Sequence, residues 1–251
     1  AVSEVMESDP VHLLADTPAA QVAMQFSDRD LLSAAVVDEN GLLLGRITID
    51  DVVDVIREQG EHSLMSMAGL DEDEDMFAPV LSSTRRRAVW LGVNLATAFL
   101  ASWVVGLFQA TLDQVVVLAI LMPIVASMGG IAGSQTLTLM IRGIALGQVE
   151  KSNSHWLLNK EIMVGLLNGL AWASIVAVAV FLWFGDWRIG FVIAAALVIN
   201  LVVAAVSGVG IPLLLRRLGI DPALAGSVVL TTLTDVIGFA AFLGLGTLLL
   251  T

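Results

Sequence analysis

Asp235 is the residue whose type and position most clearly predict chemistry in this 251-residue sequence. It lies in a long apolar segment, residues 224–250, where an unpaired carboxylate inside a membrane costs several kcal/mol. Lys, Arg and His occur only near the ends of such segments, so an internal salt bridge is difficult to build. A cation in a water-filled pore would satisfy this acid. The alternative is a protonated or hydroxyl-bonded Asp that joins helices.

Three threonines, Thr231, Thr232 and Thr234, immediately precede this acid. Their hydroxyls or carbonyls could contact a hydrated ion, or the hydroxyls could bond back to their own helix. Cysteine is absent, which disfavours soft metals, and Mg²⁺ typically keeps several waters while using one or two carboxylates. We therefore predict a magnesium site made of Asp235 and the three threonines.

A second candidate for the ion path lies in the apolar segment 115–141, which contains a proline and several glycines. Pro removes a helical hydrogen bond and Gly permits irregular backbone, which a membrane tolerates only beside protein or a wet cavity. We predict an interrupted helix whose pore-lining residues are Pro123, Gly129, Gly130, Ile131 and Gly133. Close packing of small residues between helices is the alternative.

Carboxylates recur at spacings of three and four residues near the end of the N-terminal part. Like charges so arranged repel one another unless cations neutralise them. They form a candidate regulatory metal site, with a simply solvated acidic face as the alternative: Asp50, Asp51, Asp54, Glu58 and Glu61. The histidines show no metal-ligand spacing. No catalytic triad, Walker loop or Gly-rich nucleotide fingerprint occurs, so we do not expect an enzyme.

The composition separates the chain into two unlike parts. Hydrophobic residues make up 57% and charged residues 14%, whereas an ordinary soluble domain has about a quarter charged. Residues 1–84 carry a net charge of −15 and residues 85–251 carry +3. The acidic balance argues against a nucleic-acid partner.

Ala1 is neither an initiator Met nor the start of a secretion signal, so we expect a shortened or processed start.

Five apolar segments reach the roughly 20 residues that a membrane-spanning helix needs. They are residues 88–108, 115–141, 162–184, 189–215 and 224–250. Eight Lys and Arg residues flank them on one side and only Arg188 on the other. Because cytoplasmic loops are enriched in these bases, we predict a multi-pass protein of the cytoplasmic (inner) membrane, with its N-terminal module cytoplasmic and its C-terminus outside.

The first 57 residues predict a small α/β unit. We expect a helix from Thr17-Pro18, strands at 35–37 and 42–47 around a turn at 38–41, and an acidic helix from residue 50. An acidic connecting segment, residues 61–87, includes a solvated acid run at 71–75 and three arginines at 85–87. The predicted fold is therefore an α-helical polytopic membrane protein with five transmembrane helices, preceded by this α/β module.

Several motifs carry a family resemblance. VM at 5–6, AVVD at 35–38 and GRITIDDV at 45–52 resemble one CBS motif. PIVASMGGIAGSQ at 123–135, KEI at 160–162 with Gly165 and NG at 168–169, DPAL at 221–224 and TTLTDVIG at 231–238 resemble the MgtE family of magnesium channels. The resemblance covers all five predicted spans. The family usually places a helical domain and two CBS motifs before the membrane, so we expect this chain to lack the helical domain and the first CBS motif.

The resemblance implies a homodimer with the pore at the subunit interface, where two copies of Asp235 would form a cation-selective ring. It implies a CBS motif at 1–60 (the second of a usual pair), a connecting helix or linker at 61–87 and a pore domain at 88–251. The acidic CBS surface would sense Mg²⁺, and Thr48 with Asp51 resembles an adenine-nucleotide site. The family has Asn where this chain has Ile131, so one polar contact to the ion is expected to be lost.

We therefore predict a magnesium channel regulated by its CBS module. The first alternative is a secondary transporter of divalent metals (Mg²⁺, Mn²⁺ or Co²⁺) that uses Asp235 to couple their movement to H⁺ or Na⁺. The second is a sensor or scaffold that transports nothing.

Overall fold

Two compact units, Ala1–Met65 and Ser66–Thr251, make up the chain in the computed structural model. The structure describes residues 10–70, 75–149 and 152–251. The expected motif at residues 5–6 and most of the acid run at 71–75 lie outside these described residues.

The first unit is the predicted small α/β module. Its elements are β1 (His12–Leu14), α1 (Ala19–Arg29), β2 (Ser33–Val37), β3 (Leu43–Thr48) and α2 (Ile49–Met67). The sheet order is β1-β2-β3, with β1 and β2 parallel and β2 and β3 antiparallel. Helices and sheet bury one apolar cluster that includes Leu13, Phe26 and Val52. The strands and helices thus lie close to where the turn and alternation signals predicted them.

The second unit consists of helices. They are α3 (Val80–Gly106), α4 (Gln109–Gln114), α5 (Val117–Ala145), α6 (Ser154–Phe184), α7 (Trp187–Arg217) and α8 (Pro222–Leu250). All except α4 are long and apolar enough to cross a membrane, which confirms the predicted fold class with its five spans. Helices α3 and α6 begin several residues before their predicted apolar segments. Their first two turns mix apolar residues with polar and charged ones, such as Arg85 in α3 and Lys160 in α6, and hydropathy alone does not detect such turns.

Local signals fix where α7 and α8 begin. The Asp186 carboxylate accepts a hydrogen bond from the Arg188 amide at 2.8 Å, and the Asp221 carboxylate accepts one from the Ala223 amide at 2.9 Å. These side chains cap amides that have no partner inside the helix, and Pro222 is favoured at the first helical position. The chain between α6 and α7 turns at Gly185, whose φ of 74° suits glycine.

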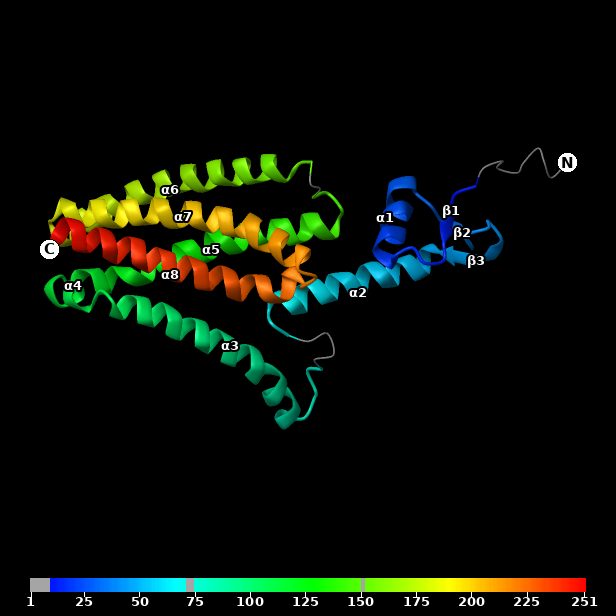
Figure 1. Ribbon diagram of the computed structural model, residues 1–251, viewed down its shortest axis with the longest axis horizontal. Coiled ribbons are helices and arrows are strands. Elements are labelled where there is room, and N and C mark those ends of the chain that lie inside the picture. The colour runs from blue at the N-terminus through cyan, green and yellow to red at the C-terminus, as the bar shows by residue number, and fades with distance from the viewer. Residues whose placement is uncertain (1–9, 71–74, 150–151) are drawn as a thin grey trace. The chain divides into compact units, whose positions relative to one another are not determined.

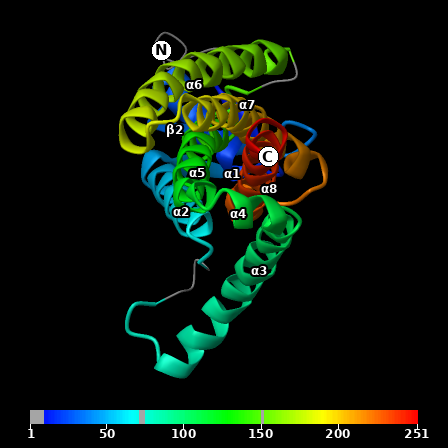
Figure 2. The ribbon, with the colours of Figure 1, turned by 90° about the vertical axis from the view of Figure 1, so that its left-hand side faces the viewer.

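Helix α7 is the centre of the membrane unit. It lies among α5, α6 and α8 (Figure 1) and packs against all three. It also contributes the largest share of buried side chains among the five candidate spans. Helix α3 instead packs mainly against α8, and Figure 2 shows it leaning away from the other spans. The predicted ion-site residues therefore lie on two helices, α5 and α8, that contact both each other and α7.

Candidate ion site in the membrane unit

Asp235 lies near the middle of α8 with its side chain partly exposed. Within the described residues, its carboxylate has no hydrogen-bond or ion-pair partner. The same residues contain no group of three or more His, Cys, Asp or Glu side chains that could hold a metal ion. One chain therefore offers a single accessible carboxylate at this level of the membrane. Such an arrangement suits an ion that keeps most of its water, as Mg²⁺ does.

The three threonines direct their hydroxyl hydrogens into their own helix. Thr231 donates to the Ser227 carbonyl at 2.9 Å, and Thr232 donates to the Val228 carbonyl at 2.7 Å. Thr234 donates at 3.1 Å to a carbonyl of the preceding turn and is fully buried. The back-bonding alternative therefore describes these side chains in the structure. The exposed Thr231 and the partly exposed Thr232 keep oxygen lone pairs that could accept a hydrogen bond from a hydrated ion.

The predicted interruption of the second span is wrong. Helix α5 runs continuously from Val117 to Ala145 with Pro123 inside it. A Cβ at Gly129 would lie 2.2 Å from the Asn200 amide nitrogen, and one at Gly133 would lie 2.9 Å from a Leu230 methyl. These two glycines therefore let neighbouring side chains approach the backbone closely, which is the packing alternative. The helix runs on through both glycines, and a neighbouring side chain packs against each of these two.

The opposite face of α5 is open. Pro123 and Ile131 are exposed, Gly130 is partly exposed, and a Cβ at Gly130 would meet nothing within 4 Å. A shallow groove of about 650 Å³ follows this face; its lining residues are Gly130, Ile131, Ser134, Gln135, Thr138 and Leu139. The residues proposed to line the pore are thus divided between a packed face and an open one, and only the open face could line an ion path.

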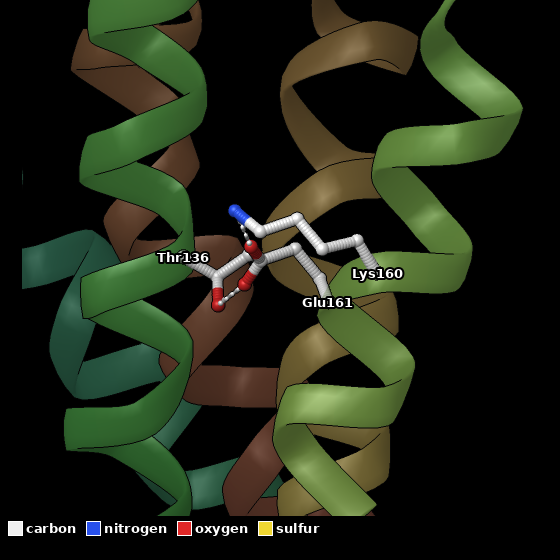
Figure 3. A network of polar contacts seen from close by, with 3 residues as sticks. All are labelled: Thr136, Lys160 and Glu161. Atoms are coloured by element: carbon white, nitrogen blue, oxygen red, sulfur yellow. Dashed lines mark hydrogen bonds and ion pairs between the residues drawn. The ribbon is translucent and has the colours of Figure 1, made fainter.

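A buried polar contact joins α5 to α6 (Figure 3). The Thr136 hydroxyl donates to Oε2 of Glu161 at 3.0 Å, while Oε1 of Glu161 lies 3.3 Å from the Lys160 ammonium. The Glu161 side chain is buried and the Lys160 side chain is half exposed. Both border a cleft of about 460 Å³ that Trp172 also lines. The sequence does not single out Glu161 as a site residue, because its partner Thr136 lies 25 positions away and only the adjacent Lys160 indicates a pair.

The acidic residues proposed as a regulatory metal site are all exposed on α2: Asp50, Asp51, Asp54, Glu58 and Glu61. Glu61 pairs with Arg57 at 3.2 Å. The Asp51 carboxylate accepts hydrogen bonds from the amide and the hydroxyl of Thr48, each at 3.1 Å. The Thr48 hydroxyl also bonds Asp50, and this bond is the main cause of the lowered pKa of the Asp50 carboxyl. Thr48 and Asp51, the candidate nucleotide residues, therefore bind each other at the start of α2.

Comparison with known proteins accounts for both units. Residues 122–245 match the MgtE family model, described as a divalent cation transporter, and residues 2–58 match the CBS domain model. Over these residues the membrane unit resembles the MgtE family. The MgtE match includes α5 to α8 almost entirely, with Asp235, the threonines and the α5 glycines inside it.

Three curated proteins similar to this chain are each named magnesium transporter MgtE. The protein from Thermus thermophilus is 32% identical over 99% of this chain and 56% of its own length. The proteins from Bacillus subtilis and Enterococcus faecalis are each 30% identical, over 90% and 86% of this chain and 50% and 47% of their own lengths. The chain thus spans about half the length of the curated relatives it matches.

Proposed function

We propose that this chain moves Mg²⁺ across a membrane through the unit formed by α3 to α8. The observation that carries the proposal is Asp235, a carboxylate without a protein partner among the described residues, on a helix of membrane-spanning length. A partly exposed carboxylate inside a membrane-spanning helix is stabilised by a cation. The ligand atoms available around it are oxygens, which favour a hard cation. The matched relatives, named magnesium transporters, support the same ion.

The proposed transporting species is a homodimer whose pore lies at the subunit interface. Two features of the single chain support it: Asp235 is partly exposed on a helix of membrane-spanning length, and on the open face of α5 a Cβ at Gly130 would meet none of the described residues within 4 Å. Paired copies of Asp235 would form an acidic ring, which selects cations. Thr231, Thr232, Gly130 and Ile131 would line the path beside it. The eight bases that flank the spans on one side favour a cytoplasmic N-terminal unit in the inner membrane and an external C-terminus.

We further propose that the N-terminal unit regulates transport. The five exposed carboxylates of α2 would bind Mg²⁺ through its hydration shell rather than as a preformed cage, because the described residues gather no cluster of three such groups. An adenine nucleotide at Thr48 and Asp51 would have to compete with the hydrogen bonds that these residues make with each other.

Flux measurements test the transport proposal. We would reconstitute the 251-residue chain in liposomes that contain a Mg²⁺-sensitive dye and compare it with Asp235→Asn. The variant is expected to lose Mg²⁺ flux or its selectivity against monovalent ions. The matched control is Asp113→Asn, which neutralises an exposed acid on the short helix α4, outside the five candidate spans. Equal flux in the wild-type chain and Asp235→Asn would refute the assignment and favour a non-transporting sensor or scaffold.

The same liposomes separate a channel from a coupled transporter of divalent metals. A channel is expected to give single-channel currents and Mg²⁺ flux that a pH or Na⁺ gradient does not drive. Saturable flux with proton or Na⁺ counterflow would contradict the channel and establish the exchanger.

Protease protection tests the regulatory proposal. Millimolar Mg²⁺ is expected to slow cleavage of the N-terminal unit of the full chain, while a monovalent salt of equal ionic strength is not. The triple variant Asp50→Asn, Asp54→Asn and Glu58→Gln should lose this protection. A matched triple variant, Asp16→Asn, Asp28→Asn and Glu39→Gln, removes three charges of the same unit outside α2 and should keep it. Equal protection in both variants would refute the α2 site.

A further inference from the structure

Three helices of the membrane unit meet around one polar side chain, Asn200 of α7. This side chain is fully buried, and its amide nitrogen donates to the Val125 carbonyl of α5 at 2.9 Å. A Cβ at Gly129 of α5 would lie 2.2 Å from that nitrogen, and a Cβ at Gly238 of α8 would lie 2.7 Å from it. We call these four residues the Asn200 node. A Cβ at either position would clash with the Asn200 amide, so both residues must be glycine for α5 and α8 to pack against it.

The orientation of the Asn200 amide follows from its neighbours. The nitrogen must face the Val125 carbonyl, because an oxygen there would meet another acceptor. The side-chain oxygen then has no hydrogen-bond partner, which makes it the single such buried side-chain atom among the described residues. It lies 3.0 Å and 3.1 Å from the Cβ positions of Gly129 and Gly238, farther than the amide nitrogen, which is the atom nearest to both positions.

Packing alone does not require an asparagine at this place. An apolar side chain of similar size would fill the same space without burying an unpaired carbonyl oxygen, which is unfavourable. The amide adds a directional interaction that an apolar side chain lacks. Its hydrogen bond joins α7 to the turn of α5 that begins at Val125 and ends at Gly129. The Asn200 node therefore fixes the position of α5 along and around α7.

The node lies beside the ion site on both of the helices that it joins. Gly238 follows Asp235 by three residues, which is about one helical turn. Gly129 immediately precedes Gly130 and Ile131 on the open face of α5. We infer that Asn200 is a positioning residue, which sets the separation between Asp235 and the open face of α5 by holding α5 and α8 against the same amide. This inference rests on the proposed transport function.

A size exchange tests the inference. Gly238→Ala places a methyl group against the Asn200 amide and should force α7 and α8 apart, while Asn200→Ala removes that amide and leaves room for the methyl. Gly238→Ala is expected to raise the half-saturating Mg²⁺ concentration for flux by up to about a hundredfold, since a misplacement near 1 Å can carry an effect of that size. The double variant should return to the level of Asn200→Ala alone. Gly244→Ala is the matched control on α8, because its Cβ would meet only Phe108 at 4.0 Å.

The readout separates positioning from folding. A purely structural role would lower the amount of folded protein, measured by size-exclusion chromatography, and leave the half-saturating Mg²⁺ concentration of the folded fraction unchanged. If Gly238→Ala does not fold, Asn200→Leu keeps the bulk and removes the hydrogen bond to Val125, and it should also raise the half-saturating concentration. An unchanged half-saturating concentration in the folded variants would overturn the inference, and so would an effect of Gly238→Ala that is equally large with and without Asn200→Ala.

A second measurement keeps the inference distinct from the transport proposal. The chain has no cysteine, so Ser134→Cys and Thr231→Cys, on exposed positions of α5 and α8, give unique sites for nitroxide labels. Gly238→Ala should change the label separation in electron paramagnetic resonance, and in a chain that already carries Asn200→Ala it should add no further change. Absence of flux in the wild-type chain would refute transport, whereas an unchanged separation in Gly238→Ala would refute the positioning role.

Discussion

The hydrogen bond between Thr136 and Glu161 gives a prediction whose size follows from the structure. Thr136→Val removes the hydroxyl that donates to Oε2 of Glu161 at 3.0 Å. The shape is kept, because Gly208 approaches Cβ and the methyl carbon of Thr136, which valine also has. The substitution therefore tests the hydrogen bond rather than the packing of α5 against α7.

Two ranges of hydrogen-bond energy bound the expected change in the free energy of unfolding. A hydrogen bond to a charged group contributes about 1.5–3 kcal/mol in soluble proteins. Interhelical polar contacts in a membrane protein average about 0.6 kcal/mol, with a maximum near 1.7 kcal/mol. Glu161 is buried and charged but keeps Lys160 as a second partner, so its carboxylate is not left alone. We expect Thr136→Val to lower the free energy of unfolding by about 1–2 kcal/mol, a factor of roughly 5–30 in the unfolding equilibrium.

The assay is a reversible sodium dodecyl sulfate titration in mixed micelles, followed by circular dichroism of the helices. Thr138→Val is the matched control, because this exposed threonine of α5 makes no side-chain hydrogen bond within the described residues. A double-mutant cycle with Glu161→Gln should give a coupling energy above the roughly 0.5 kcal/mol by which independent sites deviate from additivity. Equal effects of the two valine variants, together with additivity in the cycle, would refute the reasoning.

Two further predictions concern a helix start and a turn. Asp221→Ala removes the carboxylate that caps the Ala223 amide at the start of α8, and it should cost about 1 kcal/mol in the same titration; no loss would contradict the capping role. In the first unit, hydrogen bonds from the Leu42 and Asn40 amides lower the pKa of the Asp38 carboxyl. Its stabilising effect is therefore complete above the ordinary Asp pKa of about 3.9 and is lost as the pH falls through the lowered value. Hydrogen exchange at the Leu42 amide, corrected for intrinsic pH dependence, should show this loss of protection on acidification in the wild-type chain and not in Asp38→Asn.

The sequence predicted the features of this protein that depend on neighbours along the chain. The five spans were found because apolar length is a local property, and Asp235 stood out because a carboxylate within an apolar segment is equally local. The course of α5 was predicted wrongly because the effect of a glycine depends on what faces it. Asn200 fills the space at Gly129 and Leu230 fills the space at Gly133, and these partners lie 71 and 97 residues later.

The contact between Thr136 and Glu161 was missed for the same reason. The two residues lie 25 positions apart on different helices, and nothing in their spacing pairs them. Polar residues inside spans therefore marked possible sites in this sequence, but only the packing of α5, α6 and α7 identified which of them act together.

The central position of α7 changes what its apolar sequence means. It is the most hydrophobic of the five spans, yet it also has the largest share of side chains buried inside the protein. Its apolar residues serve as the interior of a helical bundle more than as a surface for lipid tails. A lipid-soluble photoreactive reagent should accordingly label the exposed Leu182 of α6 and spare Val192 and Leu197 of α7, which are fully buried. In this protein, the hydropathy of a helix therefore does not show whether lipid or other helices surround it.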